Sequence, residues 1–138
     1  MKPGQVAQLR RAALARKQIE ESRLAAFRRA QAVLIAEAEE LEASARQPIA
    51  ESDAESGADL AFYGRAQALL ETRAQMRRRE ARAIDPQRFQ QESALRSALK
   101  IEIASRQLES DCEEERRRNI GMRDEERREA LALLNRMT

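Results

Sequence analysis

One repeated spacing constrains the fold of this chain more than any other sequence feature. Between residues 24 and 45, mostly apolar positions recur every three and four residues, and neither proline nor glycine interrupts them. The members of this seam are Leu24, Phe27, Gln31, Leu34, Ala38, Leu41 and Ala45. Alternating spacings of three and four keep one side of an α-helix facing a partner helix. The segment is therefore expected to form one strand of a coiled coil.

The composition favours a thin coiled coil over a compact globule. Aromatic residues make up 3% of the 138 residues and charged residues 36%, and alanine is the commonest apolar residue. A compact core normally contains more large apolar side chains. Abundant Ala, Glu, Arg, Leu and Gln is typical of long helices and coiled coils. We therefore expect a single, elongated, all-α domain that spans residues 1–138.

Two proline-containing sites divide the expected helices. Residues 47–57 should form a linker, because Pro48 disfavours helix before it and turn-forming residues follow. This stretch offers two capping boxes, Ser52 with Glu55 and Ser56 with Asp59. Further along, Asp85 and Pro86 form a typical start of a helix, so the second arm should be kinked or broken there. The expected helices cover about residues 5–46, 58–84 and 86–136.

Weaker seams are expected outside the first repeat. They comprise Val6, Leu9 and Ala13; Phe62, Ala66, Leu69 and Met76, with Tyr63 and Leu70 beside them; and Ala94, Ala98, Ile101, Ser105, Leu108 and Cys112. The third seam then gives way to a charged run from residue 113 to 129. An apolar end follows, which either closes the base of a hairpin or docks on a partner: Leu131, Leu133, Leu134 and Met137.

Charge blocks indicate how the arms should pair. Residues 1–35 carry a net charge of +6, residues 36–59 of -7, residues 60–100 of +5 and residues 101–138 of -2. Folding the chain at the linker brings blocks of opposite sign together, whereas parallel self-pairing brings like blocks together. Because flanking charges set the orientation of paired helices, an antiparallel helical hairpin is expected. A three-helix bundle is the alternative.

Catalytic and ligand-binding signatures are missing from the sequence. The chain has no histidine, one cysteine and only isolated glycines, so no general base, metal cluster or phosphate loop is suggested. We expect a protein that is not an enzyme and has no cofactor or metal. The arginine triplets at 77–79 and 116–118 lack interleaved aromatic residues, so nucleic-acid binding is not expected. No segment has the length and apolar character of a membrane span.

Several stretches resemble one known family. Residues 24–46, LAAFRRAQAVLIAEAEELEASAR, are similar to the first arm of the FliJ/YscO family. Residues 59–80, DLAFYGRAQALLETRAQMRRRE, resemble the start of its return arm, and residues 113–129, EEERRRNIGMRDEERRE, the charged C-terminal part. That family supplies the central stalk of the export ATPase in flagellar and type III secretion systems. Two features depart from its pattern: the linker comes early and Pro86 interrupts the second arm.

The resemblance implies a cytoplasmic protein, with peripheral association at the inner membrane through the export apparatus as an option. Its expected partners are the export ATPase hexamer, the export gate protein and secretion chaperones. Exposed charged helix faces would guide such binding. The implied partner-binding residues are Arg10, Arg11, Arg16, Arg28, Arg29, Arg116, Arg117, Arg118, Arg127 and Arg128.

A homo-oligomeric coiled-coil scaffold or adaptor of another assembly is the rival interpretation. It predicts that the seam is buried between chains in a stable dimer or larger oligomer. The stalk interpretation favours a monomer whose seam is buried within a single hairpin.

Overall fold

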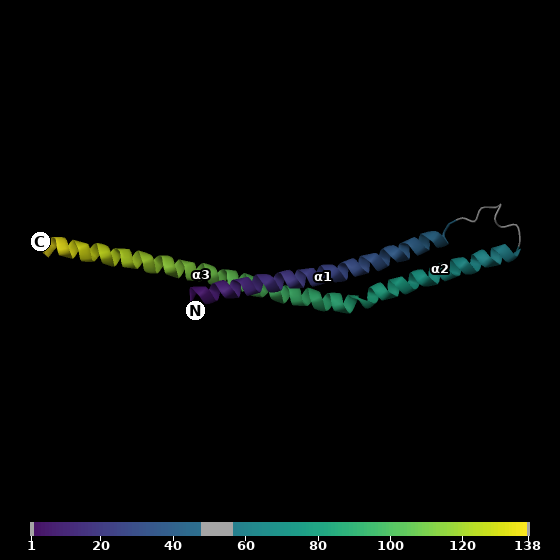
Figure 1. Cartoon of the computed structure of the whole chain (residues 1–138), viewed down its shortest axis with the longest axis horizontal. Coiled ribbons are helices and arrows are strands. Elements are labelled where there is room, and N and C mark those ends of the chain that lie inside the picture. Colours follow the sequence, from purple (N-terminus) through teal and green to yellow (C-terminus); the bar gives the residue numbers. More distant parts are fainter. Residues whose placement is uncertain (1, 48–56, 138) are drawn as a thin grey trace. The chain divides into compact units, whose positions relative to one another are not determined.

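A computed structural model describes residues 2–47 and 57–137, without the side chains of residues 57 and 58. Over these residues it contains three α-helices and no strand (Figure 1). They are α1 (Pro3–Ala45), α2 (Gly57–Ala83) and α3 (Asp85–Met137). The predicted all-α class is confirmed.

The chain divides into two compact units, a central one and a terminal one. The central unit is Glu20–Leu95, and it contains the second half of α1, all of α2 and the first turns of α3. The terminal unit combines the residues up to Ile19 with those from Arg96 onward. Most of the predicted linker, including Ser52 and Glu55 of the first capping box and Ser56 of the second, lies outside the described residues.

In the central unit, α1 buries the seam that its sequence predicts. Leu24, Gln31, Ala38 and Ala45, spaced seven residues apart, are all buried. The alternate members of the seam, Phe27, Leu34 and Leu41, are half-buried. This pattern places one stripe of α1 against its partner, as in a coiled coil.

The partner of α1 in this unit is the second arm of the same chain, which runs antiparallel to it (Figure 1). Near the end of α1, the Glu42 carboxylate lies 2.7 Å from Arg78 Nε of α2. Earlier in α1, the Glu20 carbonyl accepts a hydrogen bond from Gln91 Nε2 of α3 at 3.2 Å. The predicted helical hairpin is therefore confirmed.

Ile84 separates α2 from α3, and the second arm is kinked there. In a continuous helix, Pro86 would leave the Arg82 carbonyl without its donor and press its ring against that carbonyl. The Ile84 N–H instead bonds to the Ala81 carbonyl at 3.2 Å, and the Arg88 N–H bonds to the Ile84 carbonyl at 2.9 Å. The first turns of α3 stay against α1, so the arm does not fold back here into the alternative three-helix bundle.

The stripe predicted for α2 is correct at Ala66 but wrong at its three large members, by about one residue of rotation. Phe62, Leu69 and Met76 are 61%, 51% and 52% exposed. The less exposed side of α2 is formed by the predicted Ala66 together with Tyr63, Leu70, Ala74 and Ala81. The small size of Ala38 and Ala45 of α1 allows a close approach, which suits Ala74 and Ala81 of α2 better than the large side chains of Leu69 and Met76.

Two seam predictions in the terminal unit are also wrong. Leu9 and Ile101 are 40% and 41% exposed, while the neighbouring Arg10 is half-buried and Glu102 is buried. Arg10 and Glu102 form an ion pair across the helices, and its hydrogen bonds offset the cost of burying the charges. Val6, Ala13, Ala98 and Ser105 complete the buried stripe as the sequence predicts.

The contact of α3 with the rest of the terminal unit ends at Cys112, its last half-buried residue. Every residue from 113 to 137 is exposed, although the helix continues to Met137. We call residues 113–137 the exposed tail. The apolar residues at its end do not close the base of the hairpin: Leu131, Leu133 and Met137 are 59%, 58% and 84% exposed.

Candidate interaction surfaces

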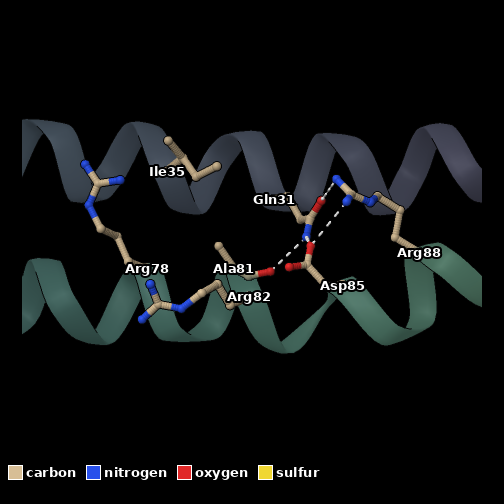
Figure 2. A pocket seen from close by; sticks show the side chains of 7 residues that line it. All are labelled: Gln31, Ile35, Arg78, Ala81, Arg82, Asp85 and Arg88. Carbon is tan, nitrogen blue, oxygen red and sulfur yellow. Dashed lines mark hydrogen bonds and ion pairs between the residues drawn. The ribbon is translucent and has the colours of Figure 1, made fainter.

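A glutamine of α1 donates a hydrogen bond to the backbone at the kink of the second arm. Gln31 is only 8% exposed, and its Nε2 donates to the Ala81 carbonyl at 2.8 Å (Figure 2). In an unbroken helix that carbonyl would accept the N–H four residues later; here it has only the 3.2 Å bond from Ile84. Gln31 thus replaces the backbone N–H that the kink removes, and the buried Ala81 carbonyl keeps a second hydrogen bond.

The same glutamine also joins the side chains at the start of α3. Its Nε2 donates to Asp85 Oδ1 at 2.6 Å, and its Oε1 accepts from Arg88 Nη1 at 3.1 Å (Figure 2). We call Gln31, Asp85 and Arg88 the polar layer. A polar layer inside a coiled-coil seam favours one register, because any slip leaves its hydrogen-bonding groups unpaired.

Around the polar layer, the Arg88 guanidinium has several weaker neighbours. Its carbon atom lies 5.0 Å from the centre of the Phe89 ring, and its Nη2 lies 3.5 Å from Asp85 Oδ1. Its Nε is buried without a hydrogen bond and lies 3.7 Å from a Glu92 carboxylate oxygen. The same Glu92 oxygen lies 3.7 Å from Arg28 Nη2 of α1, so the charge network also crosses between the helices.

The terminal unit contains a second buried polar group, the Glu102 carboxylate. It is 2% exposed and lies 2.8 Å from Arg10 Nη1 and 2.5 Å from Arg106 Nη2. Hydrogen bonds from Arg10 and then Arg106 lower the pKa of Glu102 from 4.5 to about 2. A carboxylate held ionised in this way suits a structural ion pair and not proton transfer near neutral pH.

The predicted partner-binding arginines of α1 have different surroundings. Arg10 is engaged in the Glu102 pair, and its Nε lies 3.2 Å from Glu109. Arg11 is exposed, and its Nε donates to the Ala7 carbonyl of its own helix at 3.4 Å. Arg16 and Arg29 are exposed, while the mostly exposed Arg28 pairs with Glu92. The structure therefore leaves Arg11, Arg16 and Arg29 the most accessible to a partner.

The predicted arginines of α3 all lie in the exposed tail. They are Arg116, Arg117, Arg118, Arg127 and Arg128. Arg118 Nη2 lies 3.7 Å from Glu114 Oε2, one turn earlier, which is an exposed pair of small energetic weight. These residues share one helix with the apolar end of the tail.

The sequence interpretation missed Glu102 and assigned Gln31 only to the seam. The spacing offered one signal: Glu102 lies four residues after Ala98 and three before Ser105, which places it on the buried stripe. Charge alone argued against burying it. Only the position of Arg10 across the interface shows how that charge is accommodated.

The described residues contain no group of acidic, cysteine or histidine side chains able to hold a metal ion. Among the helices described, none is long and apolar enough to cross a membrane. The grooves between α1 and α2 are open, and one of them is lined by Leu41, Arg73, Met76 and Arg77.

Comparison with known proteins gives no assignment: no family model, no curated protein and no solved structure matches the chain.

Proposed function

We propose that this chain is a non-enzymatic stalk or adaptor of a bacterial type III protein export apparatus, flagellar or virulence-associated. In this role it binds and regulates the hexameric ATPase of that apparatus. The sequence resemblance to the FliJ/YscO family suggests the proposal, and the exposed tail of α3 is the observation that carries it.

The exposed tail suits a helix that docks on a partner. Residues 113–137 remain helical although all of them are exposed, and exposed apolar side chains stand at the end. Leu133 and Met137 are four residues apart, so they lie on the same side of the helix. An amphipathic helical end is a common means of entering an apolar groove of another protein.

The interior of the hairpin supports a mechanical role over a catalytic one. In each unit, buried polar groups pair across the helices, as Gln31 does with Arg88 in the central unit and Arg10 with Glu102 in the terminal unit. Such groups fix the register of paired helices. Within each unit, paired helices of fixed register can pass on a displacement, whereas acid–base catalysis needs a pocket that holds a reactive group.

The location of the seam bears on the rival scaffold interpretation. That interpretation places the seam between chains, but α1 buries Leu24, Gln31 and Ala38 against its own second arm. The hairpin adaptor is therefore the function that this geometry favours.

ATP hydrolysis by the export ATPase of the same organism, measured with and without this protein, tests the proposal. We expect stimulation, and we expect Leu133→Ser with Met137→Ser to abolish it. Arg11→Glu with Arg16→Glu should weaken it by removing guiding charge. Arg10 is unsuitable for this test because it holds Glu102.

A matched control is Ile103→Ser, which changes an exposed apolar residue of α3 outside the tail, 59% exposed. It should leave the stimulation unchanged. If the wild-type protein neither binds the ATPase nor changes its rate, while circular dichroism shows a helical chain, the proposed function is wrong.

A further inference from the structure

The charges of the exposed tail are arranged symmetrically about Gly121. Counting outward from this glycine, five charged residues on one side have a residue of opposite charge at the same distance on the other side. The pairs are Arg118 with Asp124, Arg117 with Glu125, Arg116 with Glu126, Glu115 with Arg127, and Glu114 with Arg128. Two copies of the tail laid antiparallel and crossing at Gly121 would therefore bring opposite charges to the same level at these five positions, whereas Glu113 would meet Glu129 and Arg123 would meet the neutral Asn119.

Part of this pattern falls on one face of α3. Seven residues recur at spacings of three and four and so share one side of the helix. This charge face consists of Glu114, Arg117, Arg118, Gly121, Asp124, Glu125 and Arg128, all of them exposed. Gly121 follows Cys112 by nine residues, which at about 100° per residue is half a turn of rotation. The charge face thus points away from the side of α3 that is buried in the terminal unit.

Gly121 itself also suits a contact between two copies of the tail. Glycine in the interior of a helix lowers helix stability. A Cβ added at Gly121 would meet nothing within 4 Å, so packing among the described residues does not require the glycine. A crossing point between two helices would favour a glycine at this position, because the missing side chain allows the two backbones to approach closely.

We propose that the exposed tail is a self-association surface, through which two copies of this chain form an antiparallel, two-fold symmetric dimer centred on Gly121. Such an interface uses the same patch on both copies, and each contact occurs twice. Glu114 faces Arg128 of the second copy, and on the two edges of the interface Arg117 faces its Asp124 and Arg118 faces its Glu125. The Glu114–Arg118 pair within one chain then becomes part of a ring of alternating charges.

This inference does not rest on the proposed function, and it departs from the monomer that the sequence interpretation favoured. The hairpin seam stays within each chain, and only the tails meet. Leu133 and Met137 lie toward the buried side of α3, away from the charge face, and so stay available to another partner. The interface is formed by exposed ion pairs, so it should weaken as salt is raised.

Sedimentation equilibrium of the full chain, at ionic strengths from about 0.01 M to about 1 M, tests the dimer. We expect a dimer at low salt that dissociates as salt increases. Reversing one half of the charge face, by Asp124→Arg, Glu125→Arg and Arg128→Glu, should give a monomer, because like charges then meet in every pair.

The complementary variant reverses the other half, by Glu114→Arg, Arg117→Glu and Arg118→Glu, and should also be monomeric. A mixture of the two variants restores all the opposite pairs, and we expect it to form a heterodimer. The matched control is Glu126→Arg with Arg127→Glu, which lies off the charge face and should leave the dimer unchanged. A wild-type chain that is monomeric at low salt, or variants that still dimerise alone, would overturn the proposal.

A disulfide test checks the geometry directly, in a chain with Cys112→Ser. Gly121 lies on the two-fold axis, so Gly121→Cys should cross-link to its own copy under mild oxidation. Glu114→Cys should not, because residue 114 lies about 21 Å from its copy when the helices cross at residue 121. Efficient cross-linking through position 114 and not through position 121 would instead show a different arrangement.

Discussion

Helix α3 passes through two environments that differ in how the helix is stabilised. From Asp85 to Cys112 it has a buried stripe, with Ala98 fully buried and Glu102 paired across the interface. From residue 113 onward every described side chain is exposed, and the helix depends on its own propensity and on pairs such as Glu114 with Arg118. Each such pair contributes only about 0.2–0.5 kcal/mol.

The two stretches of α3 can therefore have different roles. Substitutions in the buried stretch should change the free energy of unfolding of the hairpin, and substitutions in the exposed tail should change association. Substitutions at Ala38, Gln31, Glu102 and Leu133 should change the stability by progressively smaller amounts, and they test this separation.

The largest effect is expected at Ala38, which is fully buried in the α1 seam. Ala38→Leu forces extra atoms between closely packed helices and should lower the free energy of unfolding by about 3 kcal/mol. The control is Ala36→Leu, the same change at an exposed position two residues away, which should stay within about 0.5 kcal/mol. Urea denaturation followed by circular dichroism measures both. Equal effects would mean that the seam is not closely packed.

The polar layer should give the next largest effect. Gln31→Leu keeps the approximate size of the side chain but leaves the Ala81 carbonyl and the Arg88 guanidinium without their shared partner. We expect a loss of about 2 kcal/mol on urea denaturation.

Gln107→Leu serves as the control for the polar layer, because Gln107 makes an exposed hydrogen bond to Asp111. Its effect should be below about 0.5 kcal/mol. A stable Gln31→Leu variant would show that the kink needs no donor from α1.

These residues also show how far the sequence could predict the fold. The spacing from Leu24 to Ala45 predicts a buried stripe that the structure confirms, because a long uninterrupted repeat determines which side of a helix is apolar. Pro86 likewise predicts the kink, because the missing N–H acts within the helix itself.

The buried side of α2 and the burial of Glu102 could not be predicted with the same success. On α2, both the large stripe of Leu69 and Met76 and the small stripe of Ala74 and Ala81 have helical spacing. The choice depends on the size of the residues that α1 presents. The burial of Glu102 depends on Arg10, which is distant in the sequence. Interactions between helices determine the buried side of α2 and the burial of Glu102. Such interactions cannot be predicted from the residue spacing within one helix.

The Glu102 pair predicts a pH dependence of stability. The pKa of Glu102 is lowered from 4.5 to about 2 in the folded chain, so the unfolded chain binds a proton more readily in this range. The stabilisation is therefore fully present above pH 4.5 and is lost as the pH falls toward 2. Hydrogen bonding to Arg78 also lowers the pKa of Glu42, which adds to the same trend.

Thermal unfolding of the wild type and of Glu102→Gln, followed across this pH range, measures the contribution of Glu102. Glutamine keeps the shape of the side chain but cannot ionise. The difference in melting temperature should be largest above pH 4.5 and should narrow toward pH 2. A constant difference would mean that the Arg10 and Arg106 contacts do not favour the ionised form.

The smallest change in stability is expected in the exposed tail, where Leu133 is 58% exposed. Leu133→Ser removes no packing from either unit and should change the free energy of unfolding by less than about 0.5 kcal/mol. The same variant should bind the partner of the tail more weakly, because the apolar contact is lost. Urea denaturation and a binding titration against the export ATPase separate the two effects. A large loss of stability with unchanged binding would mean that the tail belongs to the folded core, and the distinction between the two stretches of α3 would then fail.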